Sequence, residues 1–227
     1  MKTIGLLGGM SWESSMQYYK LINEHTNNIL GSQNNAKSVM VTVNFEQIEK
    51  LQHQNKWSEA CDILIKACQD LQNANADFIV ICTNTMHKLL PKITPYITMP
   101  FLHIADATAN EINKQNIKKV LLLGTKFTMS EDFYKDILIS QNIEVVVPSE
   151  NDMDIIHKII YDELCLGKVK EASKQIYLDI INKQDNIGGV ILGCTEIGIL
   201  INQDDLDIKV FDTTKIHSYS AVQMALK

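Results

Sequence analysis

Short apolar runs alternate along the chain with longer segments in which apolar residues recur at helical spacing. Several of the short runs are apolar throughout, which is typical of strands buried on both faces of a parallel sheet. Strands are predicted at residues 3–7, 38–43, 78–81, 120–123, 144–147, 189–192 and 209–211. Helices are predicted at 16–29, 57–74, 106–115, 131–141, 155–164 and 169–184. This alternation predicts an α/β fold with mainly parallel sheets.

Helix 57–74 shows the helical period most clearly. Its apolar face carries Ala60, Ile63, Leu64, Ala67, Cys68 and Leu71. Since Cys61 also belongs to this helix, we expect Cys61 and Cys68 to pack in or near the core.

The two halves of the chain resemble each other. KTIGLLG at residues 2–8 is similar to KKVLLLG at 118–124, so each half opens with a strand that ends in glycine. Gly8 precedes Thr83 by 75 positions, and Gly124 precedes Cys194 by 70. The repeat predicts two similar Rossmann-like domains related by a pseudo-two-fold axis. Ligands in such sheets bind beyond the carboxyl ends of the strands, so we expect the active site in the cleft between the domains.

Prolines mark the predicted domain boundary. Pro91, Pro95 and Pro100 punctuate the chain around residues 98–103. The first domain is predicted to comprise residues 1–99 and 211–227, because the helical segment 214–226 is expected to return to it. Residues 100–210 form the predicted second domain.

Composition narrows the function classes. The chain has 227 residues, of which 45% are apolar, and its net charge of −6 gives no basic surface for nucleic acid. No apolar run approaches the roughly 20 residues of a membrane helix. The five cysteines are odd in number and none forms a C-x-x-C pair, so neither a disulfide framework nor a zinc site is expected. Reduced thiols fit a cytoplasmic protein.

Three polar turns follow predicted strands, at residues 8–11, 83–85 and 194–196. Helix N-termini after such turns would favour a carboxylate or another anion. The first turn lacks the G-x-G-x-x-G spacing of a dinucleotide site. Cys194, placed between a strand and a predicted helix, is expected to have a lowered thiol pKa, with a buried inert cysteine as the alternative.

These three motifs together resemble the aspartate/glutamate racemase family, most closely its broad-specificity amino-acid racemase branch. They read GGMSWES at 8–14, CTNTMH at 82–87 and GCTE at 193–196, and the resemblance covers essentially the whole chain. It implies a two-domain α/β homodimer that acts on a small-molecule amino acid without pyridoxal phosphate, metal or other cofactor. It also implies two catalytic residues, one that removes the Cα proton and one that delivers a proton to the opposite face.

The first catalytic position departs from the family pattern. The family has cysteine directly before Asn-Thr, whereas this chain has Thr83 there and Cys82 one residue earlier. Side chains alternate along a strand, so Thr83 is expected to face the substrate and Cys82 to be structural. A threonine hydroxyl is a poor base but can donate a proton. The hypothesis is that Cys194 is the base and Thr83 the donor, with kinetics biased from L to D.

The predicted substrate-binding residues follow from the turns and the resemblance. Gln52, in a loop-like stretch, is expected to reach the substrate. Family members strict for acidic substrates carry an arginine in this region, whereas no arginine lies between Ser38 and Trp57. Lys168 is either a ligand of the substrate carboxylate or a surface lysine. Glu196 either positions a thiol-side proton or caps a helix, and His87 either serves the site or packs. The full set is Met10, Ser11, Gln52, Asn84, Thr85, Thr125, Lys168, Thr195 and Glu196.

Two other functions are also compatible with the sequence. One is a related isomerase or decarboxylase of the same superfold, in which one cysteine protonates an enolate. The other is a non-catalytic homologue that only binds an amino acid, because fold and family do not by themselves establish activity.

Overall fold

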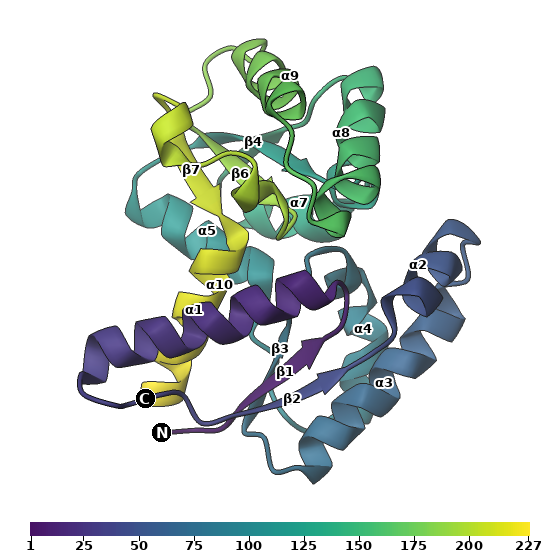
Figure 1. Cartoon of the computed structure of the whole chain (residues 1–227), viewed down its shortest axis with the longest axis vertical. Coiled ribbons are helices and arrows are strands. Elements are labelled where there is room, and N and C mark those ends of the chain that lie inside the picture. Colours follow the sequence, from purple (N-terminus) through teal and green to yellow (C-terminus); the bar gives the residue numbers. More distant parts are fainter. The chain divides into compact units, whose positions relative to one another are not determined.

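A computed structural model describes all residues from Met1 to Lys227 (Figure 1). The chain divides into two compact units. Unit 1 consists of Met1–His103 and His217–Lys227, and unit 2 consists of Ile104–Ile216. No helix combines the length and the apolar content needed to cross a membrane.

Unit 1 is built on a three-stranded parallel sheet in the order β2-β1-β3. The strands are β1 (Ile4–Gly8), β2 (Ser38–Thr42) and β3 (Phe78–Ile81). The helices are α1 (Trp12–Leu30), α2 (Phe45–His53), α3 (Trp57–Asn73) and α4 (Leu90–Ile93), with short 3₁₀ helices at Thr85–Leu89 and Thr94–Tyr96. Most of α10 (Thr213–Leu226) also belongs to this unit.

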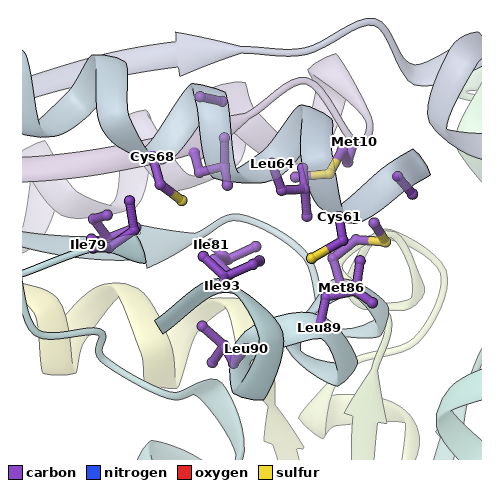
Figure 2. Packing of buried hydrophobic residues seen from close by; sticks show 14 of the residues in the cluster. Met10, Cys61, Leu64, Cys68, Ile79, Ile81, Met86, Leu89, Leu90 and Ile93 are labelled. Atoms are coloured by element: carbon purple, nitrogen blue, oxygen red, sulfur yellow. The ribbon is translucent and has the colours of Figure 1, made fainter. Parts of the chain in front are cut away.

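The two faces of the unit 1 sheet bury different helices. Leu7, Ile79 and Ile81 pack against α2, α3 and α4 on one face (Figure 2). Ile4, Leu6, Phe78, Val80 and Cys82 pack against α1 and α10 on the other. Cys61 and Cys68 lie in the first cluster, which confirms their predicted core position.

Unit 2 repeats this plan around a four-stranded parallel sheet in the order β5-β4-β6-β7. Its strands are β4 (Lys119–Gly124), β5 (Glu144–Val146), β6 (Gly189–Gly193) and β7 (Lys209–Asp212). Its helices are α5 (Ile104–Lys114), α6 (Lys126–Ser130), α7 (Asp132–Ser140), α8 (Glu150–Asp162) and α9 (Glu171–Asn182), with 3₁₀ helices at Leu164–Leu166, Ile197–Ile199 and Gln203–Asp205. α8 and α9 cover one face of this sheet, and α5 and α7 cover the other.

Strand pairing shows how the two halves of the repeat correspond. Leu7 is opposite Ile81 in the β1–β3 pair, and Gly124 is opposite Gly193 in the β4–β6 pair. Aligning Gly8 with Gly124 therefore aligns Cys82 with Gly193, and Thr83 with Cys194. The internal repeat predicted from sequence is thus present in the registers of the two sheets.

The predicted α/β class with parallel sheets is confirmed, and all seven predicted strands are present. Two local predictions are wrong. The stretch around Gln52 is the helix α2 rather than a loop, because Asn44 caps it by accepting from the Gln47 N–H. The turns at 83–85 and 194–196 lead into 3₁₀ helices of five and three residues, which are too short to carry the expected helix dipole.

Gly9, in the turn between β1 and α1, has a φ of +88°, and a Cβ there would overlap the backbone carbonyl of Val43. Gly9→Ala is expected to lower the free energy of unfolding by at least about 1–3 kcal/mol, the cost of the backbone conformation alone. Gly31→Ala is the matched control, because Gly31 has a φ of +69° but nothing within 4 Å of the added carbon. Urea unfolding of both variants measures the difference. Equal losses would show that the Val43 contact costs nothing.

Candidate functional site

The unit 1 candidates lie at the carboxyl ends of β1 and β3, which are neighbours in the sheet. Met10 and Ser11 are both buried in the turn after β1. The Ser11 hydroxyl caps α1 by accepting from the Ser14 N–H at 3.2 Å. The turn after β1 therefore leads into the N-terminus of a long α-helix, as expected, because α1 has 19 residues.

Cys82 and Thr83 occupy different environments. Cys82 has no exposed surface and packs with Val80 and Phe78 beneath α1 and α10. Burial raises the pKa of its thiol far above the ordinary value, so the side chain is a neutral core group. Thr83, the next residue, is only half-buried.

Three further unit 1 candidates are buried polar residues. Asn84 and Thr85 begin the short 3₁₀ turn after β3. The Gln52 amide, on α2, donates to the Met86 sulfur at 2.9 Å. Met86 belongs to the apolar cluster on this face of the sheet, so Gln52 is a neutral polar group beside a thioether.

The side chain of His87 belongs to a cluster of three histidines, of which His87 and His217 are buried. A carbonyl can only accept, so His87 Nδ1 carries the proton that it donates to the Thr83 carbonyl at 2.8 Å. The His87 ring packs on His103 and His217, with centroid separations of 4.6 and 5.8 Å. His217 Nε2 donates to the Leu102 carbonyl at 2.9 Å, so its Nδ1 accepts from the Tyr18 hydroxyl at 2.8 Å.

We expect the buried histidines to make the folded state less stable in acid. Burial lowers the pKa of His217 to about 3 from an ordinary 6.5, and burial followed by the charges of His103 and His217 lowers that of His87. A lowered folded pKa contributes stability that is complete above pH 6.5 and is lost as pH falls toward the folded value. We expect His217 alone to remove up to about 1.4 kcal/mol of unfolding free energy per pH unit in that window.

Urea unfolding at pH 7, 6 and 5 measures this slope. His217→Gln, which cannot take up a proton, is expected to flatten it relative to the wild type. A wild-type slope that the substitution leaves unchanged would contradict the assignment.

In unit 2, Cys194 directly follows β6 and contacts an acid. Its thiol donates to Glu196 Oε2 at 3.0 Å, and the Thr195 hydroxyl donates to the same oxygen at 2.5 Å. All three side chains are buried. The Glu196 side chain is therefore a hydrogen-bond acceptor for the thiol, and it makes no cap hydrogen bond to the following 3₁₀ helix.

The expectation of a lowered Cys194 pKa is wrong for this structure. Burial raises the pKa of the thiol well above its ordinary value, and the nearby Glu196 carboxylate raises it further. The 3₁₀ turn Ile197–Ile199 is too short to offset these effects. Cys194 is thus a protonated thiol beside a hydrogen-bond acceptor.

The two other unit 2 candidates differ in exposure. Thr125 is buried and caps α6 by accepting from the Thr128 N–H at 3.3 Å. Lys168 is exposed and follows Gly167, which has a φ of +67°. The Lys168 N–H donates to the Glu163 carbonyl at 2.9 Å, and the Glu163 carboxylate accepts from Lys170 and Ser173. The loop is therefore anchored while the Lys168 side chain stays in solvent.

Sequence reasoning missed Ser14 and Tyr18, which lie on α1 but contact Cys82 and His217. Ser14 and Cys82 are 68 positions apart in the sequence, and Tyr18 and His217 are 199 positions apart. No local sequence pattern indicates such contacts. No group of three or more His, Cys, Asp or Glu residues is placed to hold a metal ion.

Comparisons with known proteins agree with these motifs. Residues 7–221 match the Asp/Glu/Hydantoin racemase family. The chain is 22% identical to the broad-specificity amino-acid racemase RacX of Bacillus subtilis, with 98% of each chain covered. It is 45% identical to a Yersinia pestis protein provisionally assigned as an Asp/Glu racemase (TM-score 0.92) and 35% identical to an aspartate racemase homologue of Pyrococcus horikoshii (TM-score 0.87), with complete coverage of both chains in each case.

Proposed function

Because this chain belongs to the Asp/Glu/Hydantoin racemase family, we propose that it interconverts amino-acid enantiomers with its own side chains, without pyridoxal phosphate or metal. The observation that carries the proposal is the buried Cys194 thiol, hydrogen-bonded to Glu196 and equivalent in strand register to Thr83. A thiol with its own proton acceptor is suited to move a proton.

The proposed reaction consists of proton transfers. Glu196 takes the thiol proton of Cys194, and the resulting thiolate removes the Cα proton of the L-amino acid. The Cα–H electron pair remains on the substrate as a carbanion delocalised into its carboxylate. Thr83 gives its hydroxyl proton to the opposite face of Cα, which yields the D-amino acid. The threonine oxygen then regains a proton from solvent, and Glu196 releases one, so no net proton is consumed.

The barrier to this reaction has two parts: the raised pKa of the Cys194 thiol opposes its deprotonation by Glu196, and the Cα proton is only weakly acidic. Each pKa unit of mismatch between acid and base costs about 1.4 kcal/mol. Buried donors that bind the carbanionic carboxylate offset this cost, since charge develops on its oxygens in the transition state. We assign this task to the polar groups of Ser11, Asn84, Thr85 and Thr125 and, because the Thr195 hydroxyl already donates to Glu196, to the Thr195 backbone N–H.

The proposed substrate class is argued from Gln52. It is a buried neutral amide beside Met86, in a region where family members strict for acidic substrates carry an arginine. A neutral amide does not require an acidic side chain on the substrate. The exposed Lys168 side chain remains available to bind a carboxylate. We therefore propose broad specificity. We also propose a cytoplasmic homodimer that serves D-amino acid metabolism, in line with the family resemblance.

The test is Cα proton exchange across a panel of L-amino acids in D₂O. The proposal expects deuterium at Cα together with formation of the D-enantiomer. Loss of the carboxylate as CO₂ would instead indicate a decarboxylase. Thermal stabilisation by an amino acid without exchange, even at high protein concentration, would indicate a protein that only binds its ligand.

A further inference from the structure

We propose that Ser14 and His87 are positioning residues that clamp the backbone on both sides of Thr83 and thereby aim its hydroxyl at the substrate. This inference rests on the proposed function, in which Thr83 is the proton donor. It assigns a role to two side chains that the mechanism itself does not use.

Ser14 holds the peptide that precedes Thr83. Its hydroxyl donates to the Cys82 carbonyl at 2.6 Å, although Ser14 lies in the first turn of α1 and Cys82 follows β3. Ser14 itself is fixed by its N–H, which donates to the Ser11 hydroxyl. Both Ser14 and Cys82 are almost fully buried, so water does not compete for this hydrogen bond.

His87 holds the peptide that follows Thr83. Its Nδ1–H donates to the Thr83 carbonyl at 2.8 Å, and its ring is confined by His103 and His217. His217 is fixed in turn by Tyr18 and Leu102. Burial holds the pKa of His87 low, so the ring stays neutral and keeps one fixed donor.

Two planar peptides meet at the Thr83 Cα, and each carries one of these carbonyls. Because a peptide group is planar, the φ and ψ of Thr83 are the only soft angles between the two planes. Fixing both carbonyls therefore fixes the direction of the Thr83 Cβ. A β-branched side chain has few χ1 states, so the hydroxyl position follows from the backbone.

A purely structural reading is that Ser14 and His87 only satisfy buried carbonyls. The two readings differ in what is lost when the hydrogen bonds are removed. A displaced donor slows delivery of the second proton but leaves removal of the first proton to Cys194. Loss of folded protein slows both steps equally.

The experiment starts from an L-amino acid in D₂O and follows two products in one sample. One is the L-amino acid that has gained deuterium with retention, and the other is the D-amino acid. Their ratio is independent of the amount of folded enzyme. For Ser14→Ala and His87→Leu, we expect inversion to fall about 10–100-fold, since a misplacement near 1 Å costs on that order. Exchange with retention should stay within about threefold of the wild type.

Two matched variants test the cause. His87→Asn retains a donor near the position of Nδ1 and should restore the ratio to within about threefold of the wild type. Thr26→Val removes another buried α1 hydroxyl, which donates to the Ile22 carbonyl of its own helix, and should leave the ratio unchanged. An unchanged ratio in Ser14→Ala and His87→Leu would overturn the clamp while leaving the racemase proposal intact. Absence of any Cα exchange in the wild type would overturn the proposed function, and the clamp with it.

Discussion

Cys194→Ser is expected to lower deuterium wash-in at the Cα of L-amino acids by about 10³-fold, within the range that general acid–base groups contribute. The hydroxyl of serine is far less acidic than a thiol, so the Glu196 carboxylate that accepts from Cys194 cannot generate a comparable base. The measurement is exchange by NMR in D₂O.

The matched control for this prediction is Cys165→Ser. Cys165 packs against the same apolar cluster as Cys194, but it is only partly buried and the mechanism does not use it. We expect its exchange rate to stay within about threefold of the wild type. Wash-in that survives in Cys194→Ser and disappears in Cys165→Ser would reassign the base.

Thr83→Ala is expected to separate the two proton transfers. Formation of the D-enantiomer should fall about 10²-fold, because the donor on the second face is lost. Wash-in with retention should persist, because Cys194 is untouched. Cys82→Ala is the control: Cys82 lies in the core beneath α1 and α10, so its loss lowers stability without changing the ratio of the two products. If Cys82→Ala changed the ratio of the two products and Thr83→Ala did not, Cys82 would be the catalytic residue.

The predicted bias toward L-amino acids can appear only in kcat, the rate at saturating substrate. Two enantiomers have equal free energy in water, so kcat/KM must be the same in both directions. A threonine that is a poor base lowers kcat from the D side, and KM must fall in proportion. Thr83→Cys supplies a second thiol, which should bring the two kcat values together. Initial rates from each pure enantiomer measure this change.

Most of the fold could be predicted because it depends on local patterns. The strand Phe78–Ile81 is an apolar run with clear ends, and its observed bounds match the prediction. Helix α3 follows an unbroken helical period, with its buried residues on the predicted face. The helix α2 was missed because its short sequence has few apolar residues, and its start depends on a single cap at Asn44.

The candidate site was harder to predict because its chemistry depends on three-dimensional surroundings. The sequence placed Cys194 after a strand, where a helix dipole would lower its pKa. The structure instead buries the thiol beside Glu196 and follows it with a short 3₁₀ turn, so its pKa rises. Likewise, the role of Ser14 depends on a hydrogen bond to Cys82 across 68 residues. Desolvation and long-range hydrogen bonds are not encoded in any local spacing.

The discontinuity of unit 1 has a consequence for synthesis on the ribosome. Unit 2 is a single stretch, Ile104–Ile216, and can fold once that stretch has emerged. The first segment of unit 1 precedes unit 2, but its second sheet face is covered in part by Ala221, Val222 and Ala225, which follow unit 2 in the chain. Domains usually complete their folding in the order in which they are made. In this chain the order is reversed: the half made first completes the cover of its second sheet face only with residues that are made after unit 2.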